Sequence, residues 1–402
     1  MTQQPLKHPA ARLLVVDDEA VQRLIVARAA ETLGIAADGA ATLADAVERV
    51  QAVPYDVVVL DLGLREHDGI EVLRSLRQAG SDAALVFVSG FDERVRQAAA
   101  RLAAALGLRV AGTLGKPLRV DRLVALLRDL PEHARAKSAE DTAEIDPALL
   151  AAAIDNNEIV CLFQPKVTIQ ERRLVGVEVL SRWRSPVIGL VRPDRFIALA
   201  EQCGLIDRLT DRIMAQSLAL FRPWRQLRPD LTLAVNISPL SLTDLELPER
   251  VSAALADSGV APGALVLEVT EGAVMTDYVA AADIMTRLRI RGIKLSIDDF
   301  GTGHASLLSL LRMPFSELKI DQSFVRTCLN DPEAPKIIRA VVSLARELGL
   351  QLVAEGIETE PVADLLARMG CTVGQGYLYA PPLSHAAMSE RLQAPVWTEN
   401  SP

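Results

Sequence analysis

The chain has 402 residues, of which 50% are hydrophobic and 24% are charged, and its formal net charge is -9 at pH 7. This length and apolar content suffice for two domains. The negative charge argues against a protein that holds long nucleic acids by neutralising their phosphates. No basic segment followed by an apolar stretch opens the sequence, and no run reaches the roughly 18 apolar residues of a membrane span. We therefore expect a cytoplasmic protein that binds neither nucleic acid nor membrane directly.

Residues 12 to 129 alternate short β-branched runs with Ala- and Leu-rich amphipathic stretches. This alternation is typical of a parallel sheet covered by helices on both faces. It predicts a doubly wound α/β domain with five strands, at Arg12 to Val16, near Ile35, and at Tyr55 to Leu60, Ala84 to Val88 and Arg109 to Thr113. We place this domain at residues 1-130. A polar, charged linker bounded by prolines follows at 131-147.

From residue 148 to 402 the alternation continues on a longer scale and predicts eight strands, most of them followed by a helix. Eight such units in about 245 residues fit a (β/α)8 barrel. Only a short segment separates the first two strands, so we expect a modified barrel that begins with a hairpin. The predicted strands are Cys161 to Val167, Leu174 to Leu180, Leu231 to Asn236, Leu265 to Val269, Lys294 to Ile297, Glu317 to Ile320, Gln351 to Ala354 and Thr372 to Tyr377.

Acidic side chains stand at the ends of successive predicted strands in this second domain. The ends of barrel strands converge on one mouth, where such folds place catalysis. Five or six carboxylates share a small cavity only if cations offset their repulsion. Any one acid alone is explained as a helix cap or a loop charge, whereas the whole set is not. The polar residues at these strand ends are Glu178, Asn236, Glu268, Glu271, Asp298, Asp299, Lys319, Asp321 and Glu355.

The cysteines and histidines limit the kind of metal. The four cysteines stand far apart without CxxC spacing, and the five histidines form no HxH or HExxH pair. The usual zinc patterns are therefore missing from the sequence. Oxygen ligation favours Mg²⁺ or Mn²⁺, and two such ions close together are the standard arrangement for phosphodiester displacement.

Nine ordered blocks of the second domain resemble the EAL-domain cyclic di-GMP phosphodiesterases over essentially its whole length. Any single block occurs by chance, but nine blocks in order at barrel spacing do not. The blocks are Phe163-Gln164-Pro165, Glu178-Val179-Leu180-Ser181-Arg182-Trp183, Pro193-x-x-Phe196-Ile197, Val235-Asn236-Ile237-Ser238, Glu268-Val269-Thr270-Glu271, Asp298-Asp299-Phe300-Gly301-Thr302-Gly303, Lys319-Ile320-Asp321, Glu355-Gly356-Ile357-Glu358 and Gln375-Gly376-Tyr377.

The resemblance implies roles for these residues in the hydrolysis of cyclic di-GMP to linear pGpG. Two divalent ions would lie on the metal-ligand set Glu178, Asn236, Glu268, Asp298, Asp299 and Asp321. Lys319 would position the attacking water and stabilise charge, and Glu355 would assist as a base. Glu271 would anchor the loop over residues 300-306, which the resemblance links to dimerisation, so a homodimer or higher homo-oligomer is expected. Substrate contacts would come from Gln164, Leu180, Arg182 and Gln375.

Two positions depart from the pattern of this family. Val179 stands where the signature has alanine, which is a small apolar exchange beside the ligand and not a change of ligand. His304 stands where an aromatic residue is typical, and the simpler explanation for it is a solvated loop histidine. Neither departure removes a catalytic group.

The first domain places another polar set at the carboxyl edge of its sheet. Asp17, Asp18 and Asp61 can hold one Mg²⁺, with Asp61 as phosphate acceptor, while Lys116 pairs with the phosphoryl group and Ser89 hydrogen-bonds it. This set resembles the receiver domain of response regulators, and Lys116-Pro117 strengthens the match. The resemblance implies a cognate sensor histidine kinase as partner and control of the barrel by phosphorylation. The other reading is an inactive cluster retained for folding.

Two receiver positions also depart from their family. Arg65 stands where proline is usual in the loop after the acceptor, and Thr113 stands where an aromatic switch residue is usual. Threonine lacks the ring that swings inward, so we expect phosphorylation with an atypical output.

Three functions fit these patterns. The favoured one is an active phosphodiesterase, because every metal position and the lysine of the family are present. The alternatives are a non-catalytic cyclic di-GMP receptor and a phosphorylation-dependent interaction protein without nucleotide affinity. No GGDEF-type segment is present, which argues against synthesis of cyclic di-GMP.

Overall fold

The computed structural model describes residues 11-64, 69-78, 81, 83-128, 145-270, 277-301, 307-392 and 397. The chain divides into two compact units, residues 1-144 and 145-402, which are described separately below. Among the helices of the described ranges, none has the length and apolar character needed to cross a membrane. Arg65, Glu271 and His304 lie outside the described residues.

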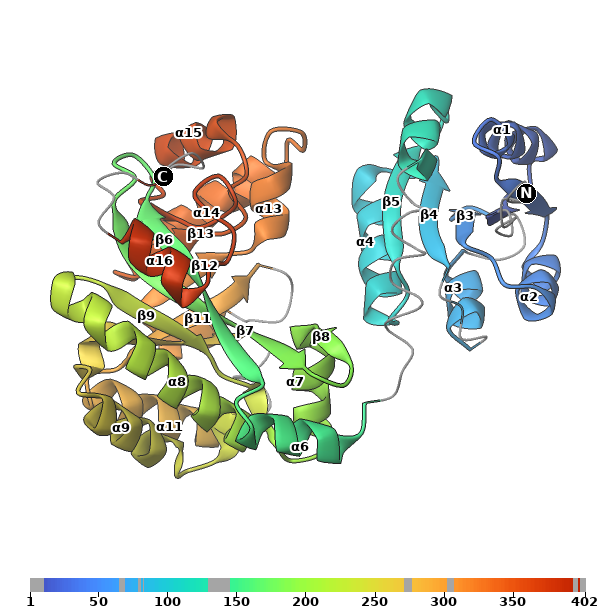
Figure 1. Cartoon of the computed structure of the whole chain (residues 1–402). Helices are drawn as coiled ribbons and strands as arrows, with labels where there is room; N and C mark the ends of the chain where they lie inside the picture. Colours follow the sequence, from blue (N-terminus) through green and yellow to red (C-terminus); the bar gives the residue numbers. More distant parts are fainter. Residues whose placement is uncertain are drawn as a thin grey trace, which may run out of the picture. The chain divides into compact units, whose positions relative to one another are not determined.

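The first unit is built on a five-stranded parallel sheet in the order β2-β1-β3-β4-β5 (Figure 1). The strands are β1 (Arg12–Val16), β2 (Ala36–Ala40), β3 (Val57–Asp61), β4 (Ala84–Ser89) and β5 (Val110–Gly115). The helices are α1 (Ala20–Glu31), α2 (Leu43–Ala52), α3 (Gly69–Gln78), α4 (Glu93–Ala105) and a helix over residues 120-128.

Helices cover both faces of this sheet. Leu14 and Val16 pack with α2, α3 and α4 in one apolar cluster, whereas Leu13 and Val15 pack with α1 and helix 120-128 in another. This division follows from the alternation of side chains along a strand. Every residue of β3 is buried, as expected of a strand between two helix layers. The predicted doubly wound fold is confirmed.

The second unit is a closed ring of eight strands in the order β6-β14-β13-β12-β11-β10-β9-β7, with β7 pairing back to β6. β6 is antiparallel to both of its neighbours, and the other ring pairs are parallel. The ring strands are β6 (Ile159–Thr168), β7 (Leu174–Ser185), β9 (Thr232–Asn236), β10 (Leu265–Thr270), β11 (Lys294–Phe300), β12 (Glu317–Ile320), β13 (Gln351–Ala354) and β14 (Val373–Gly374), and β8 (Gly189–Val191) pairs with β7 outside the ring.

Helices surround this ring (Figure 1). They are α6 (Pro147–Asp155), α7 (Pro193–Gln202), α8 (Ile206–Leu227), α9 (Leu247–Ser258), α11 (Tyr278–Ile290), α12 (Leu307–Arg312), α13 (Gln322–Thr327), α14 (Ala334–Glu347), α15 (Glu360–Met369) and α16 (His385–Arg391), with short 3-10 turns at Pro239–Thr243 and Pro262–Ala264. The modified barrel predicted from the sequence, opening with a hairpin, is confirmed.

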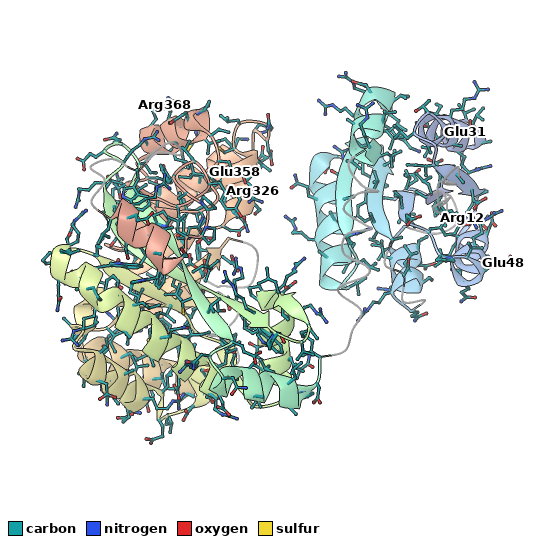
Figure 2. All side chains as sticks on the ribbon, viewed as in Figure 1. Arg12, Glu31, Glu48, Arg326, Glu358 and Arg368 are labelled. Atoms are coloured by element: carbon teal, nitrogen blue, oxygen red, sulfur yellow. The ribbon has the colours of Figure 1, made fainter. Side chains whose placement is uncertain are left out.

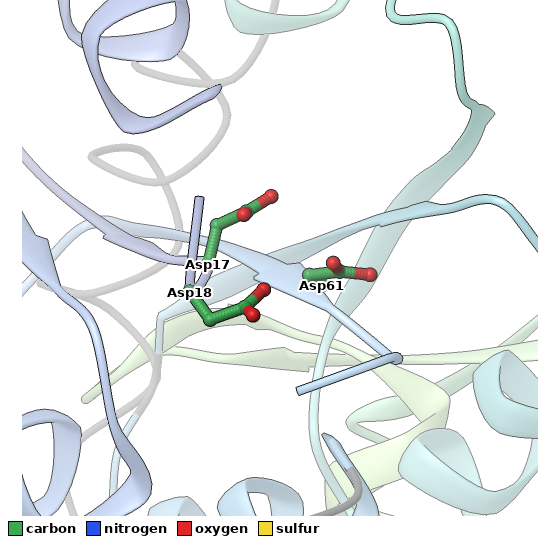
Figure 3. A group of neighbouring side chains, drawn as sticks. All are labelled: Asp17, Asp18 and Asp61. Carbon is green, nitrogen blue, oxygen red and sulfur yellow. The ribbon is translucent and has the colours of Figure 1, made fainter. Parts of the chain in front are cut away.

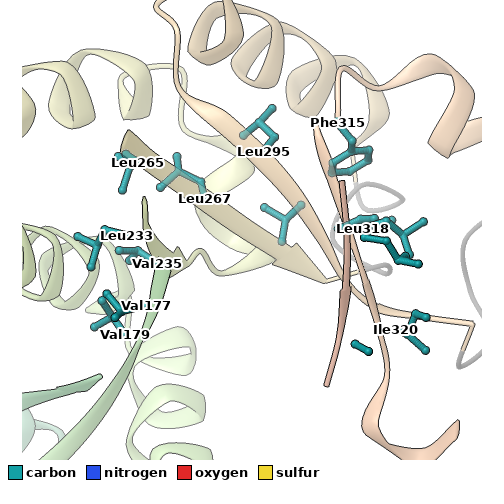
Figure 4. Packing of buried hydrophobic residues seen from close by; sticks show 14 of the residues in the cluster. Val177, Val179, Leu233, Val235, Leu265, Leu267, Leu295, Phe315, Leu318 and Ile320 are labelled. Carbon is teal, nitrogen blue, oxygen red and sulfur yellow. The ribbon is translucent and has the colours of Figure 1, made fainter. Parts of the chain in front are cut away.

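Apolar side chains on the outer face of the ring pack in one large cluster with the helices (Figure 4). Val177 and Val179 on β7 belong to this cluster, so the residue between them, Glu178, lies on the opposite, interior face. Alternation along the strands therefore separates the packing layer from the polar interior.

Several strand boundaries differ from those predicted, and three of the differences bear on the site. β7 continues to Ser185, so Glu178 lies within the strand and not at its end. Only Gly176 to Val179 pair with β9, and the later part of β7 pairs with β6 and β8. β11 continues through Asp298 and Asp299 to Phe300. β14 ends at Gly374, because the chain turns at Gly376, where φ is 156° and a Cβ atom would lie 2.2 Å from the carbonyl oxygen of Ile357.

Candidate active site in the barrel and acceptor site in the receiver

The barrel interior brings four carboxylates onto a single ammonium group. The Nζ atom of Lys319, on β12, lies 3.4 Å from Glu178, 2.9 Å from Glu268, 3.2 Å from Asp298 and 2.6 Å from Glu355. These acids come from β7, β10, β11 and the residue after β13. They are far apart in the sequence, and closure of the ring brings them together. The side chain of Lys319 is 1% exposed.

An irregularity in β11 turns two consecutive acids toward the same site. In a regular strand Asp298 and Asp299 would point to opposite faces. The register with β12 shifts between Ile297 and Phe300, and Asp299 has φ 55°, in the left-handed region that non-glycine residues seldom adopt. Carboxylate oxygens of Asp298, Asp299 and Glu355 consequently lie within 4.8 Å of one another.

The electrostatics of this group show excess negative charge. Burial raises the pKa of Glu355 to about 8, with Asp298 and Glu178 adding to the effect and Lys319 opposing it. Burial also raises the pKa of Asp299 to about 6, together with the neighbouring Asp298 and Asp321. A cation placed here would relieve this repulsion, and oxygen donors alone suit a hard divalent ion. The residues present therefore fit Mg²⁺ or Mn²⁺.

A second lysine, which the sequence analysis did not single out, lies deeper in the barrel. Lys166 on β6 is 2.6 Å from Glu268 and 3.1 Å from Glu317 through its Nζ atom, and its side chain is 3% exposed. Burial favours the protonated form of Glu268, but Lys166 and Lys319 outweigh it and lower its pKa to about 2. The signal was present in the sequence, since Lys166 follows the quoted Phe163-Gln164-Pro165 block and shares the strand face of Gln164.

Amide side chains complete the interior wall. Gln375 donates from Nε2 to Glu178 at 2.7 Å and to Gln164 at 2.9 Å, and Asn236 donates from Nδ2 to the other oxygen of Glu178 at 2.9 Å. Within the described part of the chain, the Oε1 atom of Gln375 is buried and has no hydrogen-bond partner. This oxygen is free to accept a hydrogen bond from a ligand bound at this wall.

A cavity of about 230 Å³ adjoins these groups. Its lining includes all four predicted substrate contacts, together with the ion pair of Arg326 and Glu358, 2.9 Å apart, labelled in Figure 2. A neighbouring cavity of about 340 Å³, mostly apolar, shares Leu180 and Arg182 with it and also reaches Asn236. The polar cavity thus joins the carboxylates to a surface suited to a larger organic ligand. The four contacts are Gln164, Leu180, Arg182 and Gln375.

The backbone after β13 holds Glu355 in place. Glu355 donates its N–H to the carbonyl of Ile320 at 3.2 Å, and the next residue, Gly356, has φ 68°. A Cβ atom at position 356 would lie 2.6 Å from that of Gln322. Only glycine satisfies both conditions without moving the chain.

Of the remaining predicted site residues, Asp321 is brought close and Glu271 is not described. Asp321 is the N-cap of α13 and accepts from the backbone N–H of Ser323 at 3.0 Å, while its charge also acts on Asp299. Asp321 therefore caps a helix and also lies beside the acid group. Its role as a metal ligand stays a prediction, as does the anchoring role of Glu271.

The first unit gathers its own acids at the carboxyl edge of the sheet (Figure 3). Carboxylate oxygens of Asp17, Asp18 and Asp61 lie within 4.8 Å of one another. The Nζ atom of Lys116 lies 2.7 Å from Asp61 and 3.0 Å from Asp17. Burial raises the pKa of Asp17 although Lys116 opposes it, so a divalent cation fits here as well.

Ser89, the last residue of β4, is fully buried beside this group. Its Oγ atom accepts the N–H of Phe91 at 3.1 Å, and its carbonyl accepts the N–H of Lys116 at 2.9 Å. The structure thus brings the five predicted receiver residues to one edge of the sheet, although their roles are not tested by this geometry.

Comparison with known proteins assigns a family to each of the two units. Residues 148–382 match the EAL domain family, and residues 13–128 match the response regulator receiver domain family. The cyclic di-GMP phosphodiesterase RocR of Pseudomonas aeruginosa is 34% identical over 384 residues, which cover 92% of this chain and 96% of RocR.

Two further matches concern the barrel alone. The bifunctional diguanylate cyclase/cyclic di-GMP phosphodiesterase MucR of Pseudomonas aeruginosa is 40% identical over 235 residues, 58% of this chain and 34% of MucR. A solved structure of the PaMucR phosphodiesterase in complex with c-di-GMP is 39% identical, has a TM-score of 0.57, and covers 60% of this chain and 97% of that one. The chain therefore belongs to the EAL domain family and carries a response regulator receiver domain ahead of its barrel.

Proposed function

We propose that this protein hydrolyses cyclic di-GMP to linear pGpG with the help of divalent metal ions, and that phosphorylation of its receiver domain regulates the reaction. The observation that carries the proposal is the convergence of Glu178, Glu268, Asp298 and Glu355 on Lys319 beside a cavity lined by Arg182. The named activity of RocR, which matches both units of the chain, supports the same substrate.

The residues of the chain divide the work between binding and chemistry. Arg182 would hold a phosphate through its guanidinium, and Gln164 and Gln375 would hydrogen-bond the bound nucleotide. The ligand set for the metal ions would be Glu178, Asn236, Glu268, Asp298, Asp299 and Asp321. When bound, the ions supply a water of lowered pKa and stabilise negative charge on the phosphoryl oxygens.

The reaction then needs a proton acceptor and a fixed positive charge. Glu355 would accept the proton of the attacking water at a carboxylate oxygen, and Lys319 would donate a hydrogen bond to the phosphoryl group as charge develops. The water oxygen forms a bond to phosphorus, the bond from phosphorus to the ribose 3′-oxygen breaks, and that oxygen takes up a proton. The ring opens and linear pGpG leaves.

Incubation of the full chain with cyclic di-GMP, Mg²⁺ or Mn²⁺, followed by chromatography, tests the activity. We expect pGpG, and a loss of at least about 1000-fold on addition of a chelator. Glu178→Gln should lose activity similarly, whereas Glu347→Gln, on an exposed carboxylate of α14, should not. Binding of cyclic di-GMP without pGpG would favour the receptor function, and Glu178→Gln at full activity would refute the ligand set.

The receiver half of the proposal assigns Asp61 as the phosphoacceptor, with Mg²⁺ on Asp17, Asp18 and Asp61, and a sensor histidine kinase as phosphate donor. The proposal is supported by Lys116, which lies 2.7 Å from Asp61, and by Ser89, which ends β4 at the same edge of the sheet. Acetyl phosphate should change the rate of pGpG formation by wild-type protein and leave that of Asp61→Asn unchanged. Equal responses of the two proteins would show that this receiver is no phosphorylation switch.

A further inference from the structure

Four buried charges of alternating sign form a column through the barrel interior. Glu317 lies 3.1 Å from Lys166, Lys166 lies 2.6 Å from Glu268, and Glu268 lies 2.9 Å from Lys319. None of the four side chains is more than 7% exposed. Lys319 is the member that also contacts the other carboxylates of the candidate active site.

Lys166 reaches this column from the far side of the ring. Lys166 is on β6, and the strand directly opposite β6 in the ring is β11, which is four strands away in either direction. The two residues that Lys166 contacts are on β10 and β12, the strands on either side of β11. Glu268 and Glu317 lie at the same level, each in register with Ser296 of β11. Lys166 therefore spans the barrel interior below the mouth, where its 3% exposure keeps it from substrate.

The two lysines contact different oxygens of Glu268. Lys166 donates to Oε1 at 2.6 Å, and Lys319 donates to Oε2 at 2.9 Å. A carboxylate held at one oxygen keeps a defined rotation, so its second oxygen is always presented to the same point. That point is the mouth, where Lys319 meets the other acids.

We propose that Lys166, itself held by Glu317, is a positioning residue that orients Glu268 so that its Oε2 atom alone is presented to the metal site. This inference rests on the proposed metal-dependent function. It gives a reason for a buried ion pair in a region that barrels ordinarily fill with apolar side chains. Buried ion pairs are poor sources of stability, and apolar replacements are often equally stable. Stability therefore does not explain why this buried ion pair is present, whereas a role in orienting a metal ligand does.

The competing explanation is that Lys166 only neutralises Glu317. The double variant Lys166→Met/Glu317→Gln separates the two, because it removes both charges of the pair and leaves Glu268 without its orienting contact. If neutralisation were the role, the double variant would bind metal like the wild type. The matched control is Lys336→Met/Glu333→Gln, which removes the same two charges from an exposed pair on α14.

The experiment measures binding of Mn²⁺ alone to the full chain by calorimetry, without nucleotide. Binding that persists in an Asp298→Asn/Asp299→Asn variant belongs to the receiver and is subtracted. We expect the Lys166→Met/Glu317→Gln variant to bind Mn²⁺ in the barrel about 10- to 100-fold more weakly than wild type, a range typical of lost contacts to metal ligands. The Lys336→Met/Glu333→Gln control should match wild type, and circular dichroism checks the fold of each variant.

Two single variants keep the proposal open to refutation if the double variant folds poorly. Glu317→Gln retains the contact from Lys166 to Glu268 and should keep most of the Mn²⁺ affinity, while Lys166→Arg should restore part of what Lys166→Met loses. If the folded double variant bound Mn²⁺ as tightly as wild type, and wild-type protein formed pGpG, the positioning role would be refuted and the proposed function would not. A wild-type chain that forms no pGpG would instead refute the proposed function.

Discussion

The receiver and the barrel both gather carboxylates at the carboxyl ends of parallel strands, and they differ in the lysines that stand among them. In the receiver, Lys116 contacts Asp17 and Asp61, and its side chain is 17% exposed. In the barrel, Lys319 contacts four carboxylates at 1% exposure, and Lys166 lies behind one of them. The barrel site is thus more deeply buried than the receiver site, and it holds more acidic and more basic side chains.

The difference shows in the acids themselves. Burial raises the pKa of Asp17, and Lys116 does not reverse that shift. Glu268 is fully buried, which by itself favours the neutral form, yet Lys166 and Lys319 lower its pKa to about 2. A cation at each oxygen therefore lowers the pKa of the fully buried Glu268, whereas one shared lysine leaves the pKa of Asp17 raised.

The largest effect is expected from neutralising the acid between the two barrel lysines. Glu268→Gln should lower pGpG formation at least about 1000-fold, because it removes a proposed metal ligand. It should also lower the free energy of unfolding of the barrel by about 3 to 5 kcal/mol, since Lys166 and Lys319 lose their common partner. Urea unfolding followed by tryptophan fluorescence reports on the barrel alone, because Trp183, Trp224 and Trp397 all lie there.

Asp17→Asn is the counterpart in the receiver and should not lower stability. An acid whose pKa is raised on folding destabilises the folded state when ionised, so its neutralisation removes a cost at neutral pH. Hydrogen exchange of peptides from the first unit measures this effect. A loss of receiver stability comparable to that of the barrel in Glu268→Gln would contradict the contrast between the two sites.

A second comparison uses one glycine from each site. Gly356→Ala should lower hydrolysis about 100-fold, because the left-handed backbone and the contact to Gln322 force Glu355 to move. Gly63, which donates its N–H to Asp61, would place a Cβ atom no closer than 3.4 Å to any neighbour. Gly63→Ala should therefore leave phosphorylation by acetyl phosphate intact. If Gly356→Ala hydrolysed cyclic di-GMP at the wild-type rate, the backbone at Gly356 would not be what holds Glu355 in place.

The barrel site adjoins a cavity that suits a large ligand. Arg182→Ala should raise KM for cyclic di-GMP about 10-fold with a smaller change in kcat, because the charged hydrogen bond is made to bound substrate as well as to the transition state. Arg184→Ala, two residues along the same strand and outside the cavity lining, is the control. A fall in kcat alone would place Arg182 in the chemical step.

The smallest effect is expected at an exposed ion pair of the receiver. Arg12 and Asp38 are 2.7 Å apart at the far edge of the sheet, with side chains 40% and 35% exposed. The hydrogen bond from Arg12 lowers the pKa of Asp38, so the pair stabilises above the ordinary pKa of Asp and is lost as pH falls through the lowered value. Asp38→Asn should lower the stability of the receiver only slightly, and high salt should reduce the difference from wild type that hydrogen exchange measures.

The strands and the acids at their ends followed from local patterns in the sequence. The predicted bounds of β1, β12 and β13 agree with the structure, because short apolar runs with polar ends leave few alternatives. The continuation of β7 to Ser185 was missed, since that part pairs with β6 and β8 and not with β9.

The two fold classes, the order of the elements and most residues of both acid sites could be predicted from local patterns, because these depend on periodicity within each segment. Closure of the ring decided the rest. Lys166 and Glu317 are 151 positions apart, and only the strand order sets them face to face. The left-handed Asp299 is likewise held by its neighbours. Contacts between distant strands depend on how the whole sheet closes, and no local pattern records that geometry.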